Sequence, residues 1–328
     1  MDDPAIRTEK LSRSFGELVA LEGLDLDVPR GALFALLGPN GAGKSTTIKI
    51  LTTLLAPSGG RGLVAGFDVA LHPRDVRRRT GVVFQDSSLD DRLSARENLM
   101  LHVAIFGVPS SERARRVTDV LEWIGLARVA DQLVRTFSGG MRRRLEIARA
   151  LTHEPEVLVL DEPTVGLYPQ TRRVVWDHLV HIGASRERTV FVTTHYMDEA
   201  ERCDDVAIID HGKLIARGTP REIIAHGGKE RLVVRTEDDA KTAAAAADLG
   251  FAYRETPAGL EIEGDRPELM LARLSERGLG LREVTVVRPR LEDAFVVLTG
   301  RDIRDEHDQG NGQHQAMRTR LRARGRSG

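Results

Sequence analysis

The feature that most constrains the fold of this chain is a glycine-rich stretch near residue 40. The stretch reads Gly38, Pro39, Asn40, Gly41, Ala42, Gly43, Lys44, Ser45 and Thr46, and it fills every required position of the pattern G-x-x-x-x-G-K-[ST]. A short apolar run, residues 32–37, precedes it, and residues 45–55 have the length and apolar spacing of a helix. The order strand, glycine loop, helix predicts an α/β fold in which the loop follows a buried parallel strand.

The same loop predicts a phosphate site. Glycines admit backbone angles that turn successive N–H groups toward an anion, and the following helix points its positive dipole end at that anion. Lys44 adds a charge for the β- and γ-phosphates of a nucleoside triphosphate, and the Ser45 hydroxyl is a ligand for Mg²⁺. Kinases, GTPases, helicases and transport ATPases all have such a loop, so it does not specify the reaction.

Two further predicted strands end in polar residues. Residues 157–160 lead into Asp161 and Glu162, and residues 188–192 lead into Thr193-Thr194-His195. Because the carboxyl ends of parallel strands share one edge of a sheet, these side chains are expected beside the phosphate loop. We expect Asp161 to hold Mg²⁺, Glu162 to orient or deprotonate the attacking water, and His195 to contact the γ-phosphate. Taken alone, a histidine after a strand is more often a polar cap.

A second anion site is predicted at Ser138-Gly139-Gly140-Met141, which precedes a basic helical pattern over residues 142–151. A serine hydroxyl and open glycine amides at a helix N-terminus attract phosphate. One triphosphate does not need two such sites. This favours the interpretation that the second site contacts a nucleotide bound to another copy of the chain. The alternative is a helix start capped by Ser138 with no ligand. The run Arg142 to Arg144 is interpreted as a solvated helix face.

Together with Gln85, which follows the predicted strand 81–84, these motifs occur in the order and rough spacing of an ABC transporter ATPase subunit, which residues 6–220 resemble. The resemblance implies an α/β P-loop NTPase core with an antiparallel β layer and an inserted helical subdomain at about residues 96–137. It also implies that Gln85 senses Mg²⁺ and the γ-phosphate while its loop touches the membrane subunit, and that Phe15 stacks on adenine. A phenylalanine so near a strand is nearly as often part of the core.

Within that family, the sequence Ser138-Gly139-Gly140-Met141-Arg142-Arg143-Arg144 and the segment 290–300 resemble the daunorubicin-resistance type of drug exporter. This resemblance implies ATP hydrolysis that drives export of a drug, antibiotic or lipid through a separate transmembrane permease. ATP and Mg²⁺ are the implied ligands, and the implied assembly is a homodimer joined through the nucleotide sites. The implied location is peripheral, on the cytoplasmic side of the cell membrane.

One position departs from the family pattern. Where the family usually reads Gly-Leu-Asp-Pro, this chain has Gly166-Leu167-Tyr168-Pro169. In the family, the carboxylate at this position helps to join the two nucleotide sites across the dimer. Its replacement by Tyr168 is expected to change the geometry or the coupling of hydrolysis. Our hypothesis is that ATP binding is retained and that turnover is slowed or altered.

Composition and patterning predict the domain boundaries. The chain has 328 residues and a formal net charge of -1, without the basic excess that would suggest nucleic acid. The ATPase domain is predicted over residues 1–228. Residues 229–300 are predicted to form a small α+β domain of βαββαβ, ferredoxin-like type, without a catalytic cluster. The polar, arginine-rich residues 301–328 are predicted to be a disordered tail, which is either solvated or bound to anionic lipid.

Two other function classes compete with a transport ATPase. Soluble ABC proteins that act on ribosomes or DNA usually have two cassettes or a long coiled coil, and this chain shows neither. An ATP-binding switch with little turnover is favoured only by Tyr168.

Overall fold

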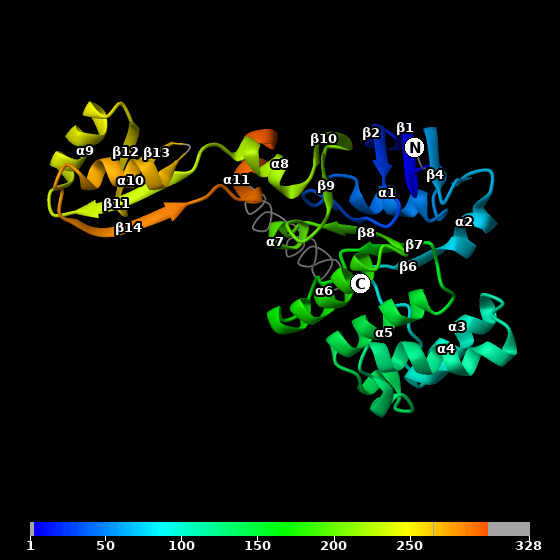
Figure 1. Ribbon diagram of the computed structural model, residues 1–328. Helices are drawn as coiled ribbons and strands as arrows, with labels where there is room; N and C mark the ends of the chain where they lie inside the picture. Colours follow the sequence, from blue (N-terminus) through cyan, green and yellow to red (C-terminus); the bar gives the residue numbers. More distant parts are fainter. Residues whose placement is uncertain (1–2, 265, 301–328) are drawn as a thin grey trace, which may run out of the picture. The chain divides into compact units, whose positions relative to one another are not determined.

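The computed structural model describes residues 3–264 and 266–300 (Figure 1). The prediction of a disordered tail at 301–328 lies outside the described residues. Packing divides the chain into two compact units, with the division between Pro220 and Arg221.

The first unit is built on a six-stranded sheet with the strand order β10-β9-β3-β8-β7-β6. Strands β9, β3, β8, β7 and β6 run parallel, and β10 is antiparallel to β9. Every residue of β3, β7 and β8 is buried, as expected for strands covered on both faces. The strands are β3 (Leu33–Leu37), β6 (Thr80–Val83), β7 (Val157–Asp161), β8 (Thr189–Thr194), β9 (Asp205–Asp210) and β10 (Lys213–Gly218).

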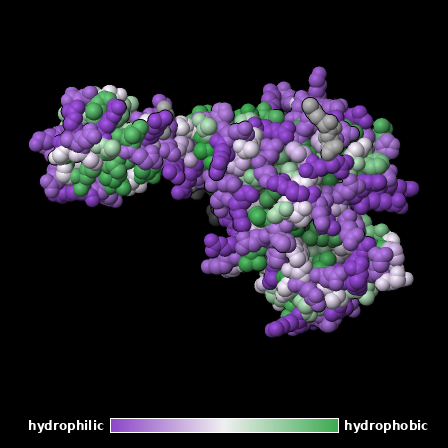
Figure 2. All heavy atoms as spheres, in the orientation of Figure 1, coloured by the Kyte–Doolittle hydropathy of each residue, from purple (hydrophilic) through white to green (hydrophobic). Residues whose placement is uncertain are grey.

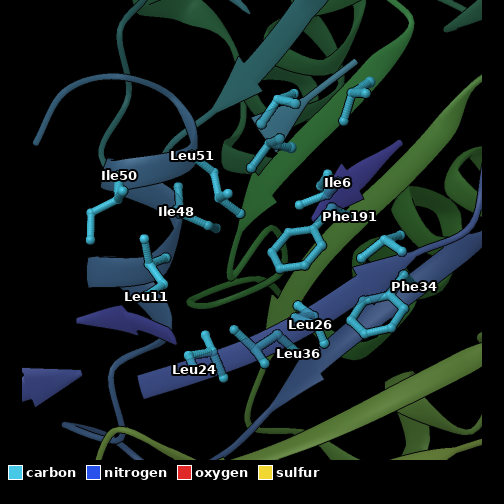
Figure 3. Packing of buried hydrophobic residues seen from close by; sticks show 14 of the residues in the cluster. Ile6, Leu11, Leu24, Leu26, Phe34, Leu36, Ile48, Ile50, Leu51 and Phe191 are labelled. Atoms are coloured by element: carbon cyan, nitrogen blue, oxygen red, sulfur yellow. The ribbon is translucent and has the colours of Figure 1, made fainter. Parts of the chain in front are cut away.

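A second, antiparallel sheet covers this core, with the order β2-β1-β4-β5. Its strands are β1 (Ile6–Phe15), β2 (Leu18–Val28), β4 (Gly59–Val64) and β5 (Phe67–Asp68). Apolar side chains of β1, β2 and α1 (Lys44–Leu51) pack with those of β3 and β8 in one cluster (Figure 3). At its centre the rings of Phe34 and Phe191 stack with centroids 5.5 Å apart. This core fixes the end of β3 and the start of α1, between which the phosphate loop lies.

The first helix is shorter than its apolar pattern predicts. The pattern extends to residue 55, but α1 ends at Leu51. The Thr52 hydroxyl donates to the carbonyl of Ile48 at 2.8 Å, and Thr53 adopts a left-handed backbone with φ of 65°. A β-branched residue in that conformation cannot continue a helix.

A helical subdomain with its own apolar cluster is inserted between β6 and β7. Its first helix begins at a complete capping box formed by Ser94 and Glu97. The elements are α3 (Ala95–Ile105), α4 (Ser110–Trp123), the short helices η1 (Ala127–Val129) and η2 (Val134–Thr136), and α5 (Gly139–Leu151). The remaining helices of the first unit are α2 (Pro73–Arg79), α6 (Pro169–Ala184) and α7 (Met197–Ala200).

The second unit contains an antiparallel sheet with the order β12-β13-β11-β14. Its buried side chains, among them Leu232, Val234 and Ile262, pack against helices α9 and α10. The elements follow as β11 (Arg231–Thr236), α9 (Asp239–Asp248), β12 (Ala252–Thr256), β13 (Gly259–Glu263), α10 (Pro267–Ser275) and β14 (Leu281–Val287). Helix α8 (Pro220–Ile224) and η3 (Ala225–Gly227) lead into this unit, and α11 (Leu291–Thr299) packs on η3.

The face of the molecule seen in Figure 2 is mostly hydrophilic, and its apolar side chains gather in small patches. Among residues 3–264 and 266–300, no helix has both the length and the apolar character needed to cross a membrane.

Candidate nucleotide site

The phosphate loop is held tightly against neighbouring backbone. A Cβ atom on Gly38 would lie 2.3 Å from the carbonyl oxygen of Ile209, and one on Gly43 would lie 2.8 Å from that of Ala20. Gly43 also has φ of 109°, a conformation that side chains rarely adopt. Both positions therefore require glycine, for steric reasons that the motif alone does not reveal.

Lys44 is the buried cation of this loop, with a side chain that is 4% exposed. Its Nζ donates to the carbonyl oxygens of Gly38 and Pro39 at 2.7 and 2.9 Å. It also lies 3.1 Å from Oε1 of Glu162. The loop cation and the carboxylate after β7 thus meet, as the strand order predicts.

Three further contacts between side chains complete this edge of the sheet. His195 Nδ1 lies 3.1 Å from Oε2 of Glu162. The Ser45 hydroxyl donates to Oδ1 of Asp161 at 3.3 Å, and the Thr193 hydroxyl donates to the same oxygen at 2.6 Å. The structure therefore brings Lys44, Ser45, Asp161, Glu162 and His195 into one connected group.

The Glu162 carboxyl is kept ionised. Burial alone would raise its pKa, but the hydrogen bond with His195 and the charge of Lys44 outweigh burial and lower the pKa to about 2. The backbone of Glu162 is left-handed, with φ of 43°. Its N–H donates to the hydroxyl of Thr193 at 3.0 Å. A catalytic candidate is thus held in a backbone conformation that is uncommon for residues other than glycine.

A buried carboxylate behind this group was missed by sequence reasoning. Glu199 of α7 is 2% exposed and accepts hydrogen bonds from the hydroxyls of Thr164 and Thr194 and from the guanidinium of Arg172. These contacts join the turn after Glu162, the end of β8 and helix α6. The available signal was an acidic residue four positions after His195, and its partners cannot be identified from one sequence.

The interpretation of residues 142–144 as a solvated helix face is wrong. Arg143 is 7% exposed, and Arg144 is partly buried and donates to the carbonyl of Ile124. Arg142 pairs with Asp91 at 2.5 Å. Consecutive residues of an α-helix point in different directions, because the helix has 3.6 residues per turn. One of three consecutive arginines therefore points into the protein.

The second predicted anion site is a helix N-terminus at the surface. Ser138 is the N-cap of α5, and its hydroxyl accepts from the N–H of Met141 at 3.3 Å. Gly139 is exposed, while a Cβ on Gly140 would lie 2.2 Å from Cγ2 of Thr171 in α6. Within the described residues no hydrogen bond joins this site to the phosphate loop. The structure therefore leaves the two anion sites of one chain separate.

The other predicted residues lie outside the connected group. Gln85 follows β6 and is exposed. Phe15 ends β1, is 46% exposed and has the Arg13 guanidinium 4.7 Å from its ring centre, so it is not a core residue. Tyr168 precedes α6 and is 81% exposed.

Known proteins share both the sequence and the fold. The family described as ABC transporter matches residues 21–165. The daunorubicin/doxorubicin resistance ATP-binding protein DrrA of Streptomyces peucetius is 40% identical, and the match covers 90% of this chain and 92% of that protein. The Nod factor export ATP-binding protein I of Ralstonia nicotianae is 39% identical, with 92% and 96% covered.

A solved structure agrees with the fold. A dimeric ATP-binding cassette in a post-hydrolysis state, bound to ADP and Pi, is 26% identical with a TM-score of 0.59, and the match covers 65% of this chain and 98% of that one. This chain therefore belongs to the ABC transporter family, as an ATP-binding and ATP-hydrolysing subunit of the daunorubicin-resistance group.

Proposed function

We propose that this chain drives the export of a drug, antibiotic or lipid by a separate transmembrane permease. The observation that carries the proposal is the meeting of Lys44, Glu162 and His195 at one sheet edge, in a chain similar over nine tenths of its length to a daunorubicin-resistance protein. The second relative is named for the export of a Nod factor. Substrate identity belongs to the permease, since no part of the nucleotide site selects a cargo.

The roles of the residues follow from their positions. Lys44 neutralises charge on the β- and γ-phosphates, and the loop amides surround them. The ionised carboxylate of Glu162 orients the attacking water and accepts its proton as the bond from the γ-phosphorus to ADP breaks. His195, in contact with Glu162, holds that carboxylate on one side and faces the γ-phosphate on the other.

The oxygen donors at this edge fit Mg²⁺. Ser45 Oγ and Asp161 Oδ1 lie 3.3 Å apart, and hydroxyl and carboxylate oxygens are the ligands that this ion prefers. When bound, Mg²⁺ supplies charge neutralisation for the phosphate oxygens. Thr193 fixes the orientation of the Asp161 carboxylate. Gln85 is the proposed sensor of the ion from the loop after β6.

The Ser138 site is proposed to complete the nucleotide site of a second copy. It lies at an exposed helix N-terminus, and in the described part of the chain no hydrogen bond joins it to the phosphate loop. A solved relative is a dimer holding the products of hydrolysis. Two copies arranged head to tail would place each Ser138 on the γ-phosphate held by the partner. Phe15 is proposed to stack on the adenine ring.

An apolar pair on α3 is proposed to contact the permease. Leu101 and Ile105 are 52% and 70% exposed and are four residues apart, so they share one helix face. Exposed apolar pairs of this kind mark contacts with other proteins. Such docking would place the chain on the cytoplasmic side of the membrane. For the second unit we propose a supporting role in the dimer, since none of its described residues belongs to the connected group around Glu162.

Purification from detergent-solubilised membranes tests this assignment. We expect a polytopic membrane protein to copurify with the native chain and to be lost from the double variant Leu101→Asp, Ile105→Asp, while the ATPase rate of the isolated subunit is unchanged. Copurification of ribosomes or DNA in place of a membrane protein would favour the soluble class of ABC proteins instead.

A further inference from the structure

One buried guanidinium contacts the backbone on both sides of the catalytic carboxylate. Arg143 Nε donates to the carbonyl oxygen of Pro163 at 2.5 Å, and Nη2 donates to those of Asp161 and Glu162, both at 3.2 Å. Nη1 donates to the carbonyl of Phe84, the residue before the Gln85 loop, at 2.6 Å. Three consecutive carbonyls of the catalytic segment are therefore bound by one side chain from α5.

The charge of this guanidinium is balanced within the same helix. Arg143 Nη1 also lies 2.8 Å from Oε2 of Glu146, which is 3% exposed. Oε1 of Glu146 accepts from the N–H of Ser88, in the loop that contains Gln85. A guanidinium has five N–H donors in a rigid fork, and here every nitrogen is engaged. The position of Arg143 relative to its partners is therefore narrowly defined.

These contacts stabilise the uncommon backbone conformation of Glu162. Glu162 has φ of 43°, which costs free energy for a residue with a Cβ and persists only where surrounding contacts enforce it. Thr193 holds its N–H, and Arg143 holds its carbonyl together with those of both neighbours. The direction in which the Glu162 carboxylate points depends on this backbone.

The same helix begins at the second anion site. Ser138 caps α5, and Arg143 lies five residues further along, in the second turn. A helix moves as a rigid element over such a distance, so a shift of its N-terminus displaces the guanidinium and the carbonyls bound to it. The Arg143 side chain therefore connects phosphate contact at Ser138 with the direction in which the Glu162 carboxylate points.

We propose that Arg143 is a positioning residue for ATP hydrolysis: it enforces the left-handed backbone of Glu162 and ties the catalytic carboxylate to the helix that carries the Ser138 site. The inference rests on the proposed role of Glu162 as the residue that activates water. Arg143 acts through the backbone around Glu162, since its hydrogen bonds are to the carbonyl oxygens of that segment and of Phe84 and to the carboxylate of Glu146.

Arg143→Lys tests the proposal, because a lysine keeps the charge but cannot supply the fork that binds successive carbonyls. We expect kcat to fall about 10- to 100-fold, since small misplacements of a catalytic group have effects of that size. KM and the equilibrium affinity for ATP should stay within about threefold, since among the described residues the hydrogen bonds of Arg143 go to Phe84, Glu146 and residues 161–163 and not to the phosphate loop. The matched control, Arg142→Lys on the same helix, should keep kcat within about twofold, since its ion pair lies at the surface.

A double-mutant cycle separates positioning from general stability. If Arg143 acts through Glu162, adding Arg143→Lys to Glu162→Gln causes no further loss of the residual rate. Multiplicative losses would overturn the proposal. So would a kcat of Arg143→Lys equal to that of Arg142→Lys, or loss of ATP binding in both Arg143→Lys and Arg143→Gln. If Glu162→Gln alone retains the native rate, the proposed role of Glu162 fails, which is a different outcome.

Discussion

Tyr168 stands at the N-cap of α6, and its phenol makes no side-chain hydrogen bond to the helix. An aspartate there would accept a hydrogen bond from a free N–H of the first turn and complement the helix dipole. We expect Tyr168→Asp to raise the free energy of unfolding by about 1 kcal/mol relative to Tyr168→Ala. Urea denaturation of the two variants measures this difference, and equal midpoints would contradict it.

The same substitution tests the effect of Tyr168 on turnover. The phenol is 81% exposed, so it is available to a second copy of the chain. Our hypothesis that it slows hydrolysis predicts a higher steady-state ATPase rate for Tyr168→Asp than for the native chain. Equal ATPase rates of Tyr168→Asp and the native chain would contradict the hypothesis.

Single residues differed in how well the sequence predicted them. Lys44, Asp161 and Glu162 were predicted because each belongs to a motif whose chemistry requires that residue type. The role of Arg143 was not predicted, because it binds backbone carbonyls, and no residue pattern in a sequence identifies such partners. Glu199 was missed for a related reason, since two of its partners, Thr164 and Arg172, are distant along the chain and become its neighbours only when the chain folds.

At the scale of elements, most boundaries followed from apolar spacing and from turn residues. Residues 59–68 form two strands and not one, because Ala65 and Gly66 both adopt positive φ and turn the chain between β4 and β5. The same effect ends α1 early at Thr53. Left-handed residues other than glycine are the points where periodicity alone misplaces an element, since the sequence gives no direct sign of them.

Two partly buried histidines join elements of the first unit and confer a pH dependence. The rings of His102, Phe106 and His153 pack together, and His153 lies 3.3 Å from the carbonyl of Thr80. Burial lowers the pKa of His102 to about 3 and that of His153 to about 4. The unfolded chain therefore binds more protons below its ordinary histidine pKa near 6.5, and stability falls as the pH drops from there toward the folded values.

We expect the free energy of unfolding to be lower at pH 5 than at pH 7 by about 2 kcal/mol from His102 alone. The variant His102→Phe fills the same space and cannot be protonated. Urea denaturation at the two pH values should show a loss that is about 2 kcal/mol smaller in His102→Phe than in the native chain. The same loss in both proteins would show that His102 does not contribute.

At the scale of the whole molecule, the account requires two copies for a complete nucleotide site. Loss of a hydrogen bond to a charged group costs about 1.5–3 kcal/mol, so Ser138→Ala should weaken ATP-dependent dimerisation about tenfold or more. Ser94→Ala removes another N-cap serine, that of α3, and should lower stability without weakening the dimer. Analytical ultracentrifugation with ATP in the Glu162→Gln background compares them. Equal effects of the two serines would show that Ser138 is only a helix cap.

The overall architecture was predictable because five short motifs fix the order of strands and loops around the nucleotide. The way in which the helical subdomain connects to the segment around Glu162 was not predictable, since it depends on Arg143 and Glu146, two charged residues that sequence patterns assign to the surface.

The most direct test of the central claim is the steady-state rate of ATP hydrolysis with Mg²⁺ by Glu162→Gln and by the native chain. We predict that Glu162→Gln loses about 100-fold or more of the native rate, the contribution of a general base, with ATP affinity within about threefold of native. A Glu162→Gln rate close to native, with ATP still bound, would contradict it.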